Sequence, residues 1–298
     1  MEWTLTAPII SHEKNYRFAP LTNRHHEVII KYCTGKDDAG LVMFMQDMLQ
    51  ELSLDKSVKY NEIPAIDQLF LLLRLRSICI GTRIDILVDG KNEEGETVPV
   101  KHRVSLIDIQ KSINKEYIQP IELIDDTNSI KTVLHYPTVW QPQDETDWIR
   151  SVTIDDTCVD FDTLEKDNKH KLLENMYRDY RITIDKNIHK LEQSINKMIF
   201  VRIPSENPGE NDPNITISHD QFYHIIRVLY SDTLSNFAEL MYVFVKVMNF
   251  SLSDAMKLTP SDTQLYYQMF VKEQNEKEKA ARAAQQAAKS NSRTVGSR

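Results

Sequence analysis

The stretch Ile63–Gly81, IPAIDQLFLLLRLRSICIG, decides the expected fold of this chain. Pro64 is tolerated in the first turn of a helix, and Gly81 is a typical residue just past a helix end. Between them, apolar residues occupy nearly every face of the predicted helix, so neighbouring elements must cover it on almost all sides. The stretch is too short for a membrane span and contains two arginines. We therefore expect a buried core helix.

The two arginines, Arg74 and Arg76, are the cations of this helix. Side chains two positions apart on a helix point about 200° away from each other. Each arginine must therefore find its own carboxylate or its own route to solvent. We interpret both as structural residues at the margin of the core.

The composition is that of an ordinary globular protein. The 298 residues can form one large domain or two ordinary ones, and 41% of them are hydrophobic. A net charge of -8 argues against a general affinity for nucleic acid. The three cysteines, Cys33, Cys79 and Cys158, are widely spaced, which argues against a disulfide framework. The first residues do not form a signal peptide, so we expect a cytosolic protein.

Two helices are expected before the core helix, over residues 22–34 and 38–52, because apolar residues recur there at three-to-four spacing. His25 and His26 lie in the first of them and project about 100° apart. We interpret them as surface residues rather than metal ligands.

Alternating segments after the core helix predict a small, mostly antiparallel sheet. They are residues 82–89, 98–106, 118–123 and 131–135. Residues 139–162 are rich in carboxylates but contain no calcium-binding loop pattern, so we expect an irregular, solvated connector.

The rest of the chain is expected to be mainly helical. Residues 234–250 are apolar on nearly all faces, and two short helices separated by Pro260 follow. A short extended piece at residues 182–184 interrupts an otherwise helical segment. The stretch from residue 274 onward is rich in alanine and charge and has no apolar stripe, so we expect a mobile tail or a frayed helix.

These expectations define an α+β fold with N-terminal helices around a buried central helix, a small antiparallel sheet, and a mostly helical C-terminal region. The predicted division is a helical and β-sheet domain at 1–140, an acidic connector at 141–163, a mainly helical domain at 164–273 and a mobile charged tail at 274–298.

An ordered set of short matches lies within residues 16–140. Its members are Pro20-Leu21-Thr22, Ile63-Pro64 with Asp67, Leu69-Phe70-Leu71, Leu73-Arg74 with Arg76-Ser77, and His135-Tyr136-Pro137-Thr138. Together they resemble the baseplate hub assembly proteins of T4-like contractile-tailed bacteriophages. The resemblance implies a tail protein that binds other baseplate hub, spike or tape-measure proteins, as an assembly chaperone or as a subunit. It also implies a place in the host cytoplasm during assembly or in the baseplate of the virion tail.

The sequence contains none of the common catalytic or nucleotide-binding motifs, such as GxSxG, HExxH, GxxxxGK[ST], GxGxxG or CxxC. We therefore expect no catalytic residues, no cofactor and no metal, and no nucleic-acid or membrane partner. The alternative is a carboxylate-based hydrolase acting on the host envelope, because the many Asp and Glu residues leave an acid–base pair open.

The candidate partner-binding residues are Leu258, Tyr266, Tyr267 and Phe270, which lie just before the charged tail. Aromatic side chains near a terminus either complete the core or supply adaptable contact area for a partner. Both readings stay open at this point, and we assign partner binding to these four residues.

Overall fold

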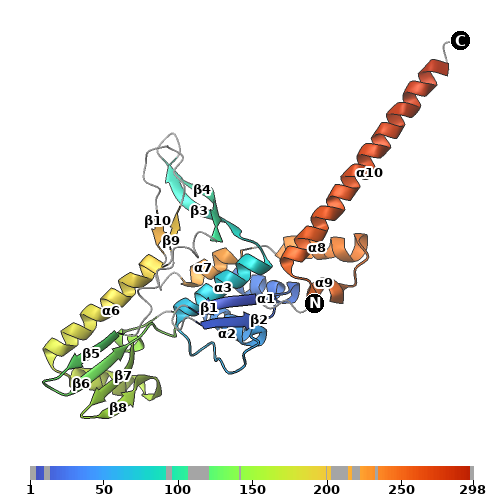
Figure 1. The fold of residues 1–298 in the computed structure, drawn as a ribbon. Helices are drawn as coiled ribbons and strands as arrows, with labels where there is room; N and C mark the ends of the chain where they lie inside the picture. The colour runs from blue at the N-terminus through green and yellow to red at the C-terminus, as the bar shows by residue number, and fades with distance from the viewer. Residues whose placement is uncertain are drawn as a thin grey trace.

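The core helix α3, Ala65–Cys79, lies at the centre of the computed structural model (Figure 1). Twelve of its fifteen residues are buried, so the predicted core helix is confirmed. It is covered all round because no face of it is polar. The structure describes residues 5–9, 14–91, 96–106, 121–140, 142–198, 200–202, 214–216, 222–231 and 234–295.

The elements around α3 come from distant parts of the chain. They are the antiparallel hairpin of β1 (Leu5–Ile9) and β2 (Lys14–Phe18), and the helices α1 (Asn23–Thr34), α2 (Asp38–Leu52) and α7 (Phe222–Leu229). Tyr230 follows α7 and donates its buried hydroxyl to the carbonyl of Leu72 in α3 at 2.8 Å. Arg227 donates to the carbonyl of Cys33 at 2.7 Å, where a cation complements the C-terminal end of α1.

Arg76 was expected to find a carboxylate or a route to solvent. Among the described residues, it instead bonds to backbone carbonyls. Its guanidinium donates to the carbonyl of Leu229 at 2.5 Å, to that of Arg83 at 3.3 Å, and to that of Gly81. These carbonyls belong to chain segments that leave α3 and α7, where the backbone has unused acceptors. The arginine therefore ties the end of the core helix to α7.

The described strands between residues 83 and 160 form two separate units. Strands β3 (Arg83–Lys91) and β4 (Thr97–Ser105) pair with each other as an antiparallel hairpin. A four-stranded antiparallel sheet follows the chain order β5 (Ile121–Asp125), β6 (Ile130–Leu134), β7 (Ile149–Ile154) and β8 (Thr157–Asp160). The Tyr180 hydroxyl of helix α6 (Arg178–Met198) donates to Thr132 at 2.9 Å and fixes this helix on the sheet.

The expected irregular connector is wrong, because β7 and β8 lie within it, next to the 3-10 helices η3 (Glu145–Trp148) and η4 (Phe161–Thr163). Ile149 and Val152 are buried against the rest of the sheet. Asp155 and Asp156 have φ values of 46° and 66° and form the tight turn between the strands. A two-residue hairpin turn needs positive φ at both positions, which Asp tolerates better than most residues. The sheet also crosses the predicted domain boundary at residue 140.

Helices α5 (Lys166–Glu174) and α6 (Arg178–Met198) follow, and then β9 (Phe200–Arg202) pairs with β10 (Asn214–Thr216). The expected interruption at residues 182–184 is wrong, since α6 is continuous there. Ile184 and Ile188 are buried, so the isoleucines serve the helical contact rather than an extended segment.

The C-terminal module consists of α8 (Leu234–Tyr242), a π-helical turn at Val243–Val247, α9 (Leu252–Lys257) and α10 (Pro260–Val295). The predicted break at Pro260 is confirmed. Residues 274–295 continue α10 as a helix that stands out from the body (Figure 1). Among the described residues, no helix has the length and apolarity that a membrane span requires.

Candidate partner-binding site

The C-terminal module is attached to the core through the first turn of α1. The buried side-chain amide of Asn23 donates to the Ala255 carbonyl at 2.8 Å and to the Thr263 hydroxyl at 2.6 Å. The backbone N–H of Asn23 donates to the Leu258 carbonyl at 2.8 Å. The first N–H groups of a helix have no partner within that helix. The Leu258 carbonyl of the C-terminal module accepts the hydrogen bond of one such N–H group. The side-chain amide of Asn23 adds two more hydrogen bonds between α1 and the module.

A second, small hydrophobic core lies where α1, α8, α9 and the π-helical turn meet. Its buried members are Ile30, Phe237, Met241, Phe244 and Ala255. Two of the predicted site residues, Leu258 and Tyr267, pack against this small core and are partly buried. They therefore contribute to the packing of the module as well as to its surface.

Tyr266 lies on another side of α10, with its ring 6.1 Å from that of Phe250. It is 41% exposed, whereas Phe270 is half-buried. The structure thus brings the four predicted residues into one module but does not place them on a single face. Their role in partner binding remains a prediction.

A cavity of about 560 Å³ lies beside Tyr267, between α1, α8 and the start of α10. His26 and Phe237 form part of its wall, and their rings meet edge to face with centroids 6.1 Å apart. His26 is buried, so our interpretation of it as a surface residue was wrong. Glu239 and Gln264 add polar groups to the wall. A pocket with aromatic walls and a few polar groups suits a protein segment that inserts an apolar side chain.

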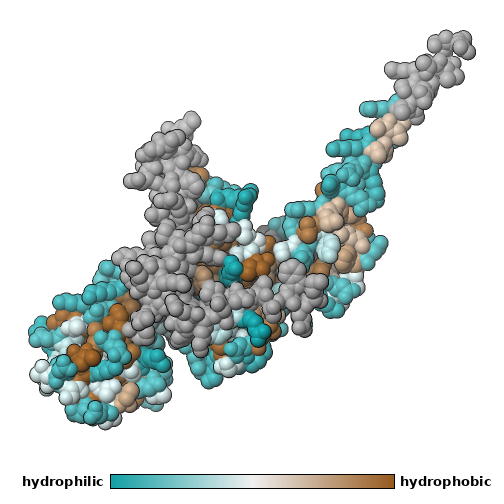
Figure 2. All heavy atoms as spheres, viewed as in Figure 1, coloured by the Kyte–Doolittle hydropathy of each residue, from teal (hydrophilic) through white to brown (hydrophobic). Residues whose placement is uncertain are grey.

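A shallow groove of about 430 Å³ continues from Tyr267 along α10, past Val271 and Glu276. Hydrophobic residues gather at the base of α10, and hydrophilic residues cover the helix above it (Figure 2). Leu265 and Met269 belong to this base and are 54% and 60% exposed. The sequence analysis assigned neither of them to the site, although their spacing of four residues places them on one helix face.

The other wall of the cavity could not be predicted. Asn23 and His26 precede the C-terminal module by more than two hundred residues. No local pattern indicates that their helix packs against α8 and α10, because this contact depends on tertiary structure alone.

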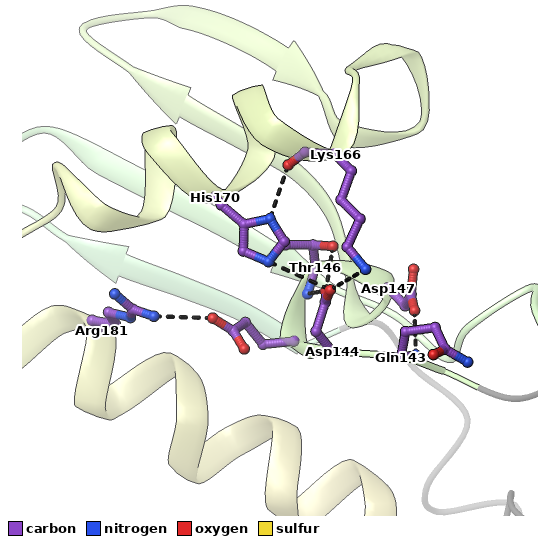
Figure 3. Close-up of polar contacts among 8 residues, drawn as sticks. Gln143, Asp144, Thr146, Asp147, Lys166, His170 and Arg181 are labelled. Atoms are coloured by element: carbon purple, nitrogen blue, oxygen red, sulfur yellow. Dashed lines mark hydrogen bonds and ion pairs between the residues drawn. The ribbon is translucent and has the colours of Figure 1, made fainter.

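Asp144 lies at the centre of a polar cluster with Lys166 and His170, residue types that can form an acid–base site (Figure 3). Its carboxylate accepts from Lys166 at 2.8 Å and from the Thr146 backbone N–H at 2.9 Å, and it lies 3.4 Å from the His170 ring. Burial alone would raise the pKa of Asp144, but the bonds from Lys166 and Thr146 outweigh it and lower the pKa to about 2.

A hydrolytic general acid requires the opposite change, a carboxyl pKa raised towards neutrality. The pKa values of Asp85 and Asp254 are also lowered, because cations and hydroxyls donate hydrogen bonds to their carboxylates. The bond from Thr146 to the Asp144 carboxylate caps η3, and the ion pair with Lys166 joins η3 to α5. The cluster is therefore structural, and it gives the hydrolase alternative no support.

The stability that Asp144 contributes should depend on pH. Its pKa is lower in the folded state than the ordinary value near 4, so its contribution is complete above about pH 4 and is lost as the pH falls towards 2. Asp144→Asn should lower the free energy of unfolding at pH 7 by about 1–3 kcal/mol. The difference from wild type should shrink below pH 4. Urea unfolding at several pH values measures it, with exposed Asp185→Asn as the control. A difference that is independent of pH would contradict the assignment.

The cysteines do not form a reactive centre in the described part of the chain. Burial raises the pKa of Cys33 to about 12, and burial likewise raises that of Cys79 to about 11. Thiols with such pKa values are poor nucleophiles and poor metal ligands at neutral pH. Within the described residues, no group of three or more His, Cys, Asp or Glu side chains is placed to hold a metal ion.

Comparison with models of protein families matches residues 2–211 to the family described as T4 bacteriophage base plate protein. No curated protein and no solved structure matches the chain significantly. The family match ends before α7, so the C-terminal module lies outside it, whereas Asn23, His26 and Ile80 in the other wall of the cavity lie within it.

Proposed function

Since the chain belongs to the T4 bacteriophage base plate protein family, we propose that it acts in assembly of the baseplate hub by binding hub or tape-measure proteins. We propose a non-enzymatic role, because the polar cluster at Asp144 has structural bonds and a lowered carboxyl pKa. The family match supports a baseplate protein, and the partner-binding surface follows from the geometry of the C-terminal module.

The observation that supports partner binding most directly is the base of α10. A cavity and a groove adjoin each other at Tyr267, and the exposed apolar side chain of Val271 forms part of the groove wall. Exposed aromatic and methionine side chains beside a pocket are the usual anchors of protein interfaces. The hub-binding segment should therefore insert an apolar side chain beside Tyr267 and continue along α10.

Two versions of this role differ in the fate of the protein. An assembly chaperone is released when the hub closes, whereas a subunit remains in the virion. The net charge of -8 favours a protein that is soluble before it meets its partner, which suits a chaperone. Mass spectrometry of purified virions distinguishes the two, because only a subunit is present in stoichiometric amount.

Partner binding should depend on the aromatic residues of α10. The Tyr267→Ala/Phe270→Ala variant should weaken binding of the hub partner by about 2–4 kcal/mol, as loss of interface anchors does. Co-purification from cells that express the phage hub proteins measures the loss. Tyr242→Ala is the matched control, because Tyr242 is 63% exposed on α8 and does not line the cavity.

A second variant separates binding from folding, since Tyr267 also packs on the small core. Val271→Asp changes an exposed side chain in the wall of the groove, so it should leave the circular dichroism spectrum unchanged while it reduces partner recovery. Unchanged recovery with both variants would place the binding surface elsewhere. A loss of soluble protein with the first variant alone would show that Tyr267 and Phe270 are needed for folding rather than for partner binding.

A further inference from the structure

Helix α10 extends well beyond the body that supports its base. Its 36 residues span about 54 Å at 1.5 Å per residue. Thr263 near the base is buried, whereas residues 271–286 are all exposed. Ion pairs at i, i+4 spacing, such as Arg282 with Glu278, stabilise this part of the helix only slightly. The outer half of α10 is therefore a free surface that a partner could use.

The outer part of α10 has a charge opposite to that of the rest of the chain. Residues 279–295 contain four Lys or Arg and no Asp or Glu, a charge of +4. The whole chain has a charge of -8, so the other 281 residues carry -12. At about 100° per residue, the helix positions of Lys279, Arg282, Lys289 and Arg293 fall within about 80° of each other. These four positions share one side of the helix, and we call them the basic row.

The complementary surface lies at the opposite end of the molecule. Residues 151–165 contain five acidic residues and no Lys or Arg, and their carboxylates occupy the β7–β8 turn, the edge strand β8 and the segment after it. These residues, which are all exposed, are Asp155, Asp156, Asp160, Asp162 and Glu165. In Figure 1 the sheet and α10 point away from each other, so the helix cannot reach the acidic edge of its own chain. A second copy can offer that edge.

We propose that the basic row of α10 docks on the acidic β7–β8 edge of a second copy of this chain. Each copy then offers one basic and one acidic surface, so the contact is head to tail and either closes into a ring or continues. Nucleic acid is the less favoured occupant, because the charge of -12 on the remaining residues repels it. The proposed hub binding uses the cavity and the groove at the base of α10, and that groove shares only Lys279 with the basic row.

The test is sedimentation velocity of the full chain over a range of concentrations at 50 mM and 500 mM NaCl. We expect self-association at low salt and a monomer at high salt, because exposed ion pairs are screened. Lys279→Glu/Arg282→Glu should weaken the association at least tenfold. Lys277→Glu makes the same charge reversal as Lys279→Glu but about 160° away around the helix, so it should have little effect.

The decisive experiment mixes two variants, each of which we expect to remain monomeric alone. Lys279→Glu/Arg282→Glu gives an acidic row, and Asp155→Lys/Asp156→Lys gives a basic hairpin. An equimolar mixture should associate at 50 mM NaCl, because each surface then finds an opposite charge on the other variant. A monomeric wild type at low salt, an association unaffected by the reversals, or a mixture that stays monomeric would overturn the proposal. So would binding of a DNA duplex through the basic row without self-association.

Discussion

The Leu73→Asp variant is expected to lose its cooperative thermal unfolding. Leu73 lies in α3 and is fully buried. An unpaired carboxylate in that position costs several kcal/mol, and the whole domain is typically stable by about 5–15 kcal/mol. Circular dichroism during heating measures the transition. The control is Met43→Asp, since Met43 in α2 is 65% exposed and should accept a carboxylate with little loss. A melt within a few degrees of wild type would show that α3 is not the core.

The second large effect is expected at Gln68, whose fully buried carboxamide joins α3 to two other segments. Its Nε2 donates to the Ile63 carbonyl at 2.9 Å and to the Thr138 carbonyl at 3.3 Å. Its Oε1 accepts from the Trp140 indole at 2.7 Å and from Gln46 at 3.0 Å. Gln68→Leu leaves these buried groups without a partner.

The expected destabilisation of Gln68→Leu is about 3–5 kcal/mol, because each buried group that loses its hydrogen bond costs about 1–3 kcal/mol. Urea unfolding followed by tryptophan fluorescence measures it. Gln46→Leu is the control, since the indole of Trp140 still satisfies Gln68 in that variant and the loss should stay near 1 kcal/mol. Equal losses in the two variants would show that the carboxamide is not the shared anchor.

The sequence was most informative where one helix had to be covered on all sides. The apolar residues of α3 must be buried because they cover nearly every face of the helix. In α2 the apolar residues recur at three-to-four spacing, so they define the one face that is buried. The strands β3 to β6 followed from alternation for the same reason. These elements are determined by local patterns of solvation, which a single sequence displays directly.

The strands β7 and β8 were missed because their carboxylates suggested a solvated connector. The acidic residues do face solvent, but they occupy an edge strand and a tight turn. Ile149, Val152 and Ile154 are the apolar residues that join this hairpin to the sheet. The acidic composition of the whole segment outweighed these few apolar residues. The local pattern that indicates a hairpin is the Asp155–Asp156 turn followed by Cys158 and Val159.

The candidate site was predictable only in part. Tyr266, Tyr267 and Phe270 were recognised because aromatic residues precede a stretch with no apolar stripe. Their separation onto different sides of α10 follows from packing against Phe250 and the small core. The opposite wall of the cavity comes from α1, and no pattern near either helix encodes that contact.

The bonds of Asn23 have a consequence for the order in which the chain folds during synthesis. Its partners Ala255, Leu258 and Thr263 leave the ribosome more than two hundred residues after α1. Synthesis proceeds at about 5–20 residues per second, so the Asn23 amide of α1 lacks its final acceptors for at least about ten seconds. A nascent chain interrupted before α9 therefore keeps an open seam beside Ile30.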